Sequence, residues 1–117
     1  MDIRKETGNK GEDFAATFFV SKGFRVVEKN WNCRLGEIDL IVERDGEVRF
    51  IEVKTRYSME YGYPEEAITP AKLRHVARAI EMWLRAHPEP KHYQADALAI
   101  LILPGQEPDI TWIEGIL

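Results

Sequence analysis

The sequence predicts an α/β fold in which a central mixed sheet is flanked by helices. Two stretches with helical periodicity, at residues 9–22 and 69–87, alternate with runs rich in branched apolar residues. Asp45-Gly46 lies between two such runs and is a strong hairpin signal. The apolar run at 96–103 is typical of a strand covered on both faces. The expected order is helix, three strands, helix, two strands, within one domain that spans residues 1–117.

The first helix is expected over residues 9–22. Asn9 is a candidate N-cap, Glu12 three residues later completes a capping-box pattern, and Gly23 ends the helix. At about 100° per residue, Glu12 falls inside an arc of apolar side chains, where a carboxylate is costly unless it has a partner. Two interpretations of Glu12 therefore carry equal weight: a helix cap that points to water, or a member of a functional site.

The hairpin carries charges that need an explanation. Residues 24–31 are expected to form the first strand, and residues 36–43 and 48–56 the next two. Because strand side chains alternate between faces, Glu52 and Lys54 share a face, and Asp39 lies near the same end on the paired strand. Carboxylates that close together repel each other unless a cation lies between them. The simpler alternative is a cross-strand salt bridge on an exposed face.

A long connection and a second helix follow. Residues 57–68 form a loop with Gly62 and Pro64, and connections of this length are often functional. The second helix starts with Thr69 as N-cap and Pro70 in its first position. Its predicted core-facing stripe consists of Leu73, Val76, Ala77, Ile80, Trp83 and Leu84. Residues 96–103 and 109–114 are expected to be the last two strands.

Basic side chains gather on the second helix and beside the hairpin. Arg74 and Arg78 lie opposite the apolar stripe, and the alternative for them is a solvated face. Lys72 lies in the first turn, where a cation opposes the helix dipole, so it either extends into solvent or is held by a carboxylate or phosphate. Together with Arg56, these three residues are the candidate phosphate contacts.

Composition and charge limit the classes of function. Apolar runs stay short of the roughly 20 residues needed to span a bilayer, and the first residues lack the apolar core of a signal peptide. The single Cys33 excludes an internal disulfide and a multi-cysteine zinc site. A cytoplasmic protein without membrane contact is expected. The net charge of −4 argues against general nucleic-acid binding, but residues 36–68 carry −5 and residues 69–92 carry +3, which suits a metal-binding cleft with basic shoulders.

Metal-assisted phosphodiester cleavage needs hard oxygen ligands, a group that positions water, and a positive charge near the phosphate. Asp39 and Glu52 can supply the oxygens, and the backbone carbonyl of Val53 can add another. Lys54, beside them, can orient the water or stabilise the developing charge. The expected cofactor is Mg²⁺ or Mn²⁺.

The element order and the Asp-x12-Glu-x-Lys spacing resemble the restriction-endonuclease-like nuclease superfamily. A longer series of motifs resembles the YraN-like family of uncharacterised bacterial proteins, which is similar to archaeal Holliday junction resolvases. The motifs are Gly11-Glu12, Gly23-Phe24, Asn30-Trp31, residues 36–41, residues 50–56, Gly62, Pro64, Lys72, Ala79 and Trp83-Leu84. This resemblance covers nearly the whole chain. It implies a restriction-endonuclease-like fold with Glu12, Asp39, Glu52 and Lys54 at the positions of the resolvase active site.

Three functional hypotheses follow. The first is a divalent-metal-dependent endonuclease that acts on DNA, with branched DNA such as Holliday junctions as the candidate substrate. The second is a non-catalytic nucleic-acid-binding module that retains the nuclease fold, and the third is a structural protein with surface carboxylates. The complete set of four site residues favours the first over the second. A homodimer is also predicted, because pairing doubles the number of basic residues available to phosphate and places two active sites across one junction.

Overall fold

The computed structural model describes residues 3–90 and 92–117, and their side chains from Lys10 onward. The elements follow the order α1 (Ile3–Ser21), β1 (Arg25–Cys33), β2 (Gly36–Arg44), β3 (Glu47–Arg56), η1 (Pro64–Ala67), α2 (Pro70–Ala86), β4 (His92–Leu101) and β5 (Asp109–Ile113). The predicted order of helices and strands is confirmed. The short 3₁₀ helix η1 is an addition inside the predicted loop.

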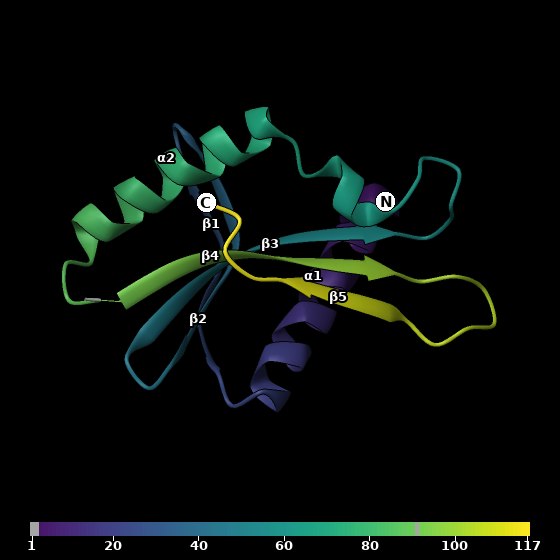
Figure 1. Ribbon diagram of the computed structural model, residues 1–117, viewed down its shortest axis with the longest axis horizontal. Helices are drawn as coiled ribbons and strands as arrows, with labels where there is room; N and C mark the ends of the chain where they lie inside the picture. Colours follow the sequence, from purple (N-terminus) through teal and green to yellow (C-terminus); the bar gives the residue numbers. More distant parts are fainter. Residues whose placement is uncertain (1–2, 91) are drawn as a thin grey trace.

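A five-stranded sheet in the order β1-β2-β3-β4-β5 forms the centre of the molecule (Figure 1). β3 and β4 are parallel, and the other neighbouring strands are antiparallel. The predicted mixed sheet is therefore confirmed, with the apolar β4 inside it between β3 and β5. This mixed α/β architecture is consistent with a restriction-endonuclease-like fold.

The β2–β3 hairpin fixes the position of the central strand. Asp45 and Gly46 both have positive φ values, 53° and 80°, as the tight two-residue turns of hairpins require. The ladder runs from the Arg44↔Glu47 pair to the Leu40↔Ile51 pair and ends there, although both strands continue beyond it. β2 and β3 therefore separate at the end of the hairpin that carries Asp39 and Glu52.

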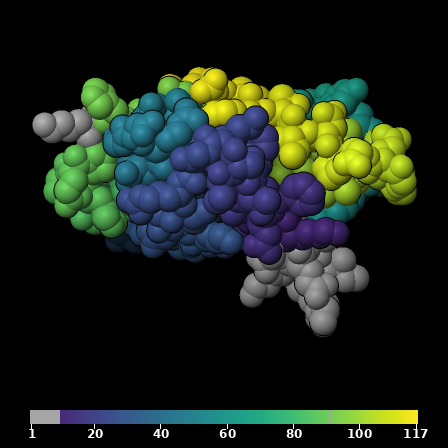
Figure 2. All heavy atoms as spheres, turned by 90° about the horizontal axis from the view of Figure 1, so that it is seen from below, coloured from purple at the N-terminus to yellow at the C-terminus, as the bar shows by residue number. Residues whose placement is uncertain are grey.

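The two long helices cover opposite faces of the sheet (Figure 1). One core, under α1, consists of Ala15, Ala16, Phe19, Phe24, Leu40, Val42, Ile51, Leu98 and Ile100. The other, under α2, consists of Ile38, Ile41, Val48, Phe50, Val76, Ala79, Ile80, Trp83 and Ala95. In the space-filling view from below, α1 lies against atoms of the first strands and of the C-terminal segment (Figure 2). Within the described part of the chain, no helix is long and apolar enough to cross a membrane.

Both helices differ from the sequence expectation in detail. α1 begins at Ile3, so Glu12 lies in the interior of a helix, and its interpretation as part of a capping box is wrong. The N-cap of α2 is confirmed, because the Thr69 side chain accepts a hydrogen bond from the Lys72 backbone N–H at 3.3 Å. Ala77 is exposed and Ala79 is buried instead, since residues 76, 79, 80 and 83 share the face that meets the sheet.

Candidate metal centre

A cleft of about 310 Å³ opens where β2 and β3 separate, beneath the first turns of α2. It is lined by Glu37, Asp39, Glu52, Val53, Lys54, Lys72, His75 and Val76. Strand alternation on β3 places Glu52 and Lys54 on the side of the sheet that α2 covers, the side on which Phe50 packs, and Asp39 of β2 lines the same cleft. The structure therefore brings together the two carboxylates and the lysine that the hairpin pattern singled out.

Asp39 and Glu52 form the buried centre of the cleft. Asp39 Oδ2 accepts a hydrogen bond from the Val53 N–H at 2.8 Å, and Glu52 is 7% exposed. Burial, followed by the charge of Glu52, raises the pKa of Asp39 to about 8. Burial also raises the pKa of Glu52, and this rise is opposed by Lys72, whose Nζ lies 3.4 Å from Glu52 Oε1. Two buried carboxyl groups in contact need a proton or a cation between them.

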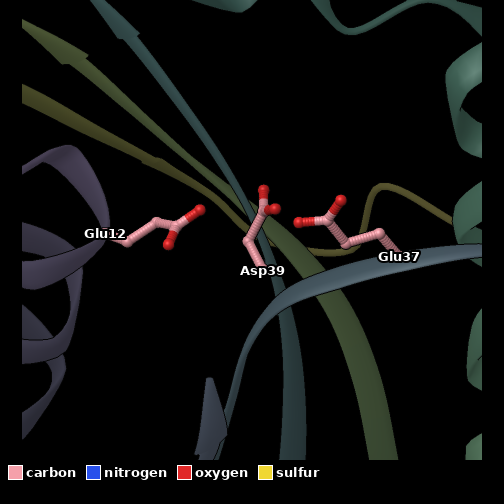
Figure 3. A group of neighbouring side chains, drawn as sticks. All are labelled: Glu12, Glu37 and Asp39. Carbon is pink, nitrogen blue, oxygen red and sulfur yellow. The ribbon is translucent and has the colours of Figure 1, made fainter. Parts of the chain in front are cut away.

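Glu12 and Glu37 extend the acidic centre beyond this pair. Ligand oxygens of Glu12, Glu37 and Asp39 lie within 4.8 Å of one another. Figure 3 shows the three carboxylates pointing toward a common point, Glu12 from α1 and the other two from β2. Burial raises the pKa of Glu12, and the nearby charge of Glu37 adds to this rise. Glu12 therefore reaches Asp39 from the opposite face of the sheet, through the gap between the separating strands.

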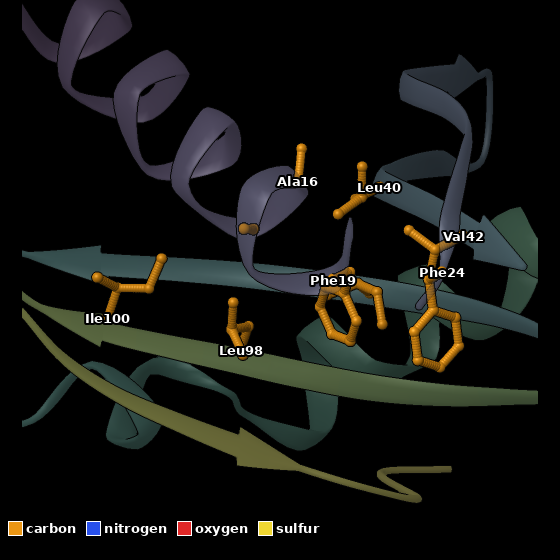
Figure 4. Packing of buried hydrophobic residues seen from close by; sticks show 9 residues of the cluster. Ala16, Phe19, Phe24, Leu40, Val42, Leu98 and Ile100 are labelled. Carbon is orange, nitrogen blue, oxygen red and sulfur yellow. The ribbon is translucent and has the colours of Figure 1, made fainter. Parts of the chain in front are cut away.

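The position of Glu12 depends on a close contact between α1 and β3. A Cβ at Gly11 would lie 2.0 Å from Thr55 Oγ1, so glycine is needed where the helix crosses the strand. Further along α1, Ala16 and Phe19 pack against Leu40 and Leu98 of the sheet (Figure 4). The helix is therefore held both at the glycine contact and by the core, and Glu12 projects from the turn beside the contact.

The position of the cleft's other wall depends on a second glycine contact. A Cβ at Gly36 would lie 2.7 Å from the backbone oxygen of His75, so the start of β2 touches the backbone of α2. This contact places Lys72 and His75, one helical turn apart, over the cleft. The same stretch of β2 thus supplies Glu37 and Asp39 and sets the distance to the basic helix.

Lys54 lies at the edge of the cleft among other cations. Burial, then the charges of Lys72 and Arg56, lowers the pKa of Lys54, and Glu52 and Asp39 oppose this effect. Arg56 is half-buried, and its buried Nε has no hydrogen-bond partner among the residues that the structure describes. A concentration of positive charge therefore flanks the acidic centre on one side.

The donor set suits a hard divalent cation. Carboxylate oxygens are the ligands that Mg²⁺ and Mn²⁺ prefer, and no cysteine lines the cleft. The N–H and C=O groups of one strand residue point to the same neighbouring strand. Because the Val53 N–H points to Asp39, the Val53 carbonyl also faces the side where the β2 ladder has ended. Asp39, Glu52 and this carbonyl fit Mg²⁺ or Mn²⁺, with Glu12 and Glu37 beside them.

Sequence reasoning found most of this centre but not all of it. Lys72 lines the cleft as one of the predicted basic residues, whereas Arg74 and Arg78 are exposed on α2 outside its lining. Glu37 and His75 were missed. Glu37 lies two residues before Asp39 on β2, and His75 lies one helical turn after Lys72. Both signals are in the sequence. The chemical roles of all these residues stay predictions.

Comparison with known proteins places the chain in a family. Residues 11–100 match the profile of the uncharacterised protein family UPF0102. The chain belongs to the UPF0102 family. This confirms the resemblance to YraN-like proteins. The matched range contains Glu12, Glu37, Asp39, Glu52, Lys54 and Lys72, so the whole candidate centre lies within the family region.

The chain is similar along nearly its full length to several UPF0102 proteins. It is 44% identical to one from Renibacterium salmoninarum, and the aligned region covers 99% of each chain. It is 37% identical to one from Leifsonia xyli subsp. xyli, again with 99% of each chain covered. With one from Clavibacter michiganensis subsp. michiganensis it shares 36% identity over 94% of each chain.

Proposed function

We propose that this UPF0102 protein is a divalent-metal-dependent endonuclease that hydrolyses phosphodiester bonds in DNA. The observation that carries the proposal is the convergence of Asp39, Glu52 and Lys54 in one cleft, with Glu12 reaching Asp39 from the other face. Buried acidic groups beside a lysine are what metal-assisted phosphoryl chemistry needs. A purely structural role leaves unexplained why three carboxylates meet within 4.8 Å.

In this proposal Asp39, Glu52 and the Val53 carbonyl hold Mg²⁺ or Mn²⁺, and Glu12 and Glu37 complete the acidic surroundings. When bound, the ion supplies Lewis-acid polarisation of the phosphate and a water molecule that ionises more easily. In the overall reaction, a water oxygen bonds to phosphorus and one P–O ester bond breaks. One strand end becomes a phosphate monoester, and the other takes up a proton and becomes a hydroxyl.

The cations of the cleft contribute at the phosphate. Lys54 projects from β3 beside the carboxylates, where an ammonium group stabilises negative charge that develops on phosphate oxygens. Lys72 contacts Glu52 at 3.4 Å and is 46% exposed, so it can remain near the carboxylate or turn toward an incoming phosphate. Arg56 adds positive charge near Lys54, which supports its proposed role in DNA contact.

The proposal is tested by incubating the purified protein with linear, flapped and four-way DNA in Mg²⁺, in Mn²⁺ and in EDTA. Cleavage is expected with either cation and not in EDTA. Glu52→Gln and Lys54→Ala are expected to abolish cleavage, because they remove a ligand charge and the phosphate-side cation. Both variants should keep the wild-type circular dichroism spectrum, since these changes remove charge rather than apolar packing.

Arg85→Ala provides the matched control. Arg85 pairs with Glu81 on the exposed face of α2 and does not line the cleft. This variant should cut as fast as the wild type. If Glu52→Gln and Lys54→Ala also cut at that rate, the activity belongs to another site or to a contaminant. Metal-independent binding without cleavage would instead support the non-catalytic nucleic-acid-binding alternative.

A further inference from the structure

A loop rich in tyrosine joins the two sides of the cleft. Residues 57–63 read Tyr-Ser-Met-Glu-Tyr-Gly-Tyr and follow directly after β3, which carries Lys54 and Arg56. The chain then forms η1 and enters α2, which carries Lys72. In Figure 1 the loop projects beyond the end of β3, and in Figure 2 teal atoms of this region lie at the same end of the molecule as the β4–β5 turn.

The loop is anchored at both ends and turns sharply in between. At its start, the Ile102 N–H donates to the Arg56 carbonyl at 2.9 Å, and at its end Pro64 is buried. In the middle, the Gly62 N–H donates to the Met59 carbonyl at 3.1 Å, and Gly62 has a φ of +85°. These hydrogen bonds and the buried Pro64 hold the backbone of the loop in one turn.

Two tyrosines on this turn have rings that are exposed to solvent. Tyr61 is 72% exposed and Tyr63 is 51% exposed, so neither ring contributes much to the core. Met59, on the same turn, is 41% exposed. An exposed aromatic group on a fixed backbone loses little conformational entropy when a flat partner stacks on it.

The charges of the loop show which part of a nucleic acid it can face. From residue 57 to residue 71 the chain has no lysine or arginine, while Glu60, Glu65 and Glu66 are acidic. Such a segment repels phosphates, so the nucleic-acid backbone must follow the cations at Lys54, Arg56 and Lys72. What the loop can offer is the face of an aromatic ring, and every nucleobase has a matching face.

We infer that Tyr61 and Tyr63 form a stacking platform for unpaired bases of a strand that leaves the cleft past Lys54 and Arg56, at the end of β3, so that the preferred substrate is DNA with a single-stranded segment or an open branch point. Base pairs inside a duplex are already stacked on each other and present only their edges to a protein. The platform therefore selects DNA whose bases are splayed where the strand leaves the cleft. This inference rests on the proposed function, because it assumes that DNA phosphate lies at Lys54 and Lys72.

The test is binding of labelled forked DNA measured by fluorescence anisotropy, with Ca²⁺ in place of Mg²⁺ so that strand cleavage does not intervene. Three probes have the same length: a fork with normal bases in its unpaired arms, a fork with abasic arms, and a full duplex. The wild type is expected to bind the base-bearing fork at least about tenfold more tightly than the abasic fork, the size of effect that one stacked base gives.

The variants separate stacking from charge. Tyr61→Ala and the double variant Tyr61→Ala/Tyr63→Ala should lose the preference for bases, and Tyr61→Phe should keep it because the ring remains. Neither tyrosine change should alter the slope of log affinity against log salt, whereas Lys72→Ala should reduce that slope by about one. Tyr93→Ala is the matched control, since Tyr93 is 54% exposed on β4 outside the loop.

The outcomes are distinct. If the tyrosine variants bind the base-bearing fork as the wild type does, or if the wild type binds both forks equally, the platform is refuted and the proposed endonuclease stands. If the tyrosine variants change only the solution mass, the loop is a contact between copies of the chain and the platform is again refuted. If the wild type binds none of the DNA probes, both the platform and the proposed function fail.

Discussion

Asp39 couples the stability of the protein to pH and to metal. Its carboxyl has a pKa of about 8 in the folded chain and an ordinary value of 3.8. Because folding raises this pKa, protonation of Asp39 stabilises the folded state. This contribution to the free energy of unfolding is fully present below about pH 4 and is lost as the pH rises through about 8. In EDTA, the melting temperature should therefore fall between pH 6 and pH 8.5. Mn²⁺ should raise the melting temperature more at pH 8.5 than at pH 6, because it binds the deprotonated carboxylates.

Asp39→Asn is the control for this titration, since an amide does not bind a proton in this range. The variant should lose most of the pH dependence between pH 6 and pH 8.5 and most of the response to Mn²⁺. Scanning fluorimetry at each pH gives both quantities, and about 1 kcal/mol corresponds to a shift of roughly 4 °C for a chain of this size. A wild-type melting temperature that rises with pH in EDTA would contradict the assignment.

A second buried charge, Asp96, serves stability rather than chemistry. Its Oδ2 accepts hydrogen bonds from Arg49 Nη1 at 2.7 Å and from Trp112 Nε1 at 2.9 Å. Its Oδ1 accepts from Gln94 Nε2 at 2.8 Å and from the Gly115 N–H at 2.9 Å. The Asp96 side chain is fully buried. Burial alone would lower the pKa of Arg49, but the hydrogen bonds that Arg49 donates to Glu114 and Asp96 raise it above its ordinary value.

Replacing Asp96 should destabilise the fold strongly. Asp96→Ala removes the fully buried partner of the Arg49 guanidinium and leaves it only the more exposed Glu47 and Glu114, which costs about 3–5 kcal/mol in the free energy of unfolding. Arg85→Ala removes an exposed pair with Glu81 and should cost at most about 0.5 kcal/mol. Urea unfolding followed by circular dichroism measures both variants. Equal midpoints for the two would show that the Asp96 network contributes little.

The sequence predicts individual site residues where a local rule applies to them. Glu52 and Lys54 follow from strand alternation, and Asp39 from the pairing of their strands, once the Asp45-Gly46 hairpin is recognised. Glu37 lies near Asp39 in the sequence, but Ile38 and Leu40 pack under different helices, so alternation alone does not place it. The partner of Glu12 is different, because Glu12 reaches Asp39 only through the gap between β2 and β3. That gap is a tertiary feature, and no periodicity within the helix encodes it.

At the level of elements, the docking of α1 on β3 can be tested through Gly11. Helix propensity alone makes Gly→Ala in a helix interior stabilising by about 1 kcal/mol. The Cβ of Gly11→Ala would instead meet Thr55 Oγ1 at 2.0 Å. We expect a net loss of about 1–3 kcal/mol, typical of an overpacked contact, and weaker Mn²⁺ binding because Glu12 moves with the helix.

A second substitution checks that the contact is the cause. Thr55→Ala removes the clashing oxygen and leaves its Cβ 3.1 Å from the new methyl group, so the double variant Gly11→Ala/Thr55→Ala should regain part of the stability. Thermal melting and isothermal titration with Mn²⁺ measure the two effects. If Gly11→Ala melts higher than the wild type, helix propensity dominates and α1 has room to shift.

The elements themselves were predictable to different degrees. Strands β2 and β3 and the start of α2 were predicted to within one or two residues, because a hairpin turn and a Thr-Pro cap are strong local signals. The start of α1 was missed by six residues, because Asn9 and Glu12 imitate a capping box inside a longer helix. β4 begins four residues before the predicted start, since pairing with β3 extends an otherwise polar segment into the sheet.

The whole molecule has few positive charges with which to hold DNA. Its net charge is −4, and the basic candidates are Arg56, Lys72, Arg74 and Arg78. Affinity from phosphate contacts grows with the number of lysines and arginines that are engaged. A symmetric pair doubles that number, so we predict a homodimer. Light scattering at high micromolar concentration should give about twice the chain mass of 13.5 kDa.

DNA binding at rising salt completes this prediction. In a dimer, the exposed Arg74 and Arg78 of both copies can reach the same duplex, so the salt slope should fall when both are replaced by alanine. The control is the stability of the same double variant. Its free energy of unfolding should stay within about 0.5 kcal/mol of the wild-type value, because both side chains are exposed. A mass of one chain at all concentrations would contradict the dimer.

The parallel pairing of β3 with β4 has a consequence for how the molecule assembles. The three strands β1, β2 and β3 join neighbours along the chain and can form early, as local contacts do. β4 pairs with β3 only after the chain between them, residues 57–91 with all of α2, closes into a loop. Closing so large a loop is slow, and until it closes β3 is an open edge that can recruit another chain. α2 packs on β1 and β2 and touches the start of β2 where Gly36 meets His75, so Lys72 can reach the carboxylates before β4 pairs. A ribosome-bound chain that has made α2 but not β4 therefore already holds the neighbours of a divalent cation while β3 is still an open edge, and this is the form most prone to aggregate.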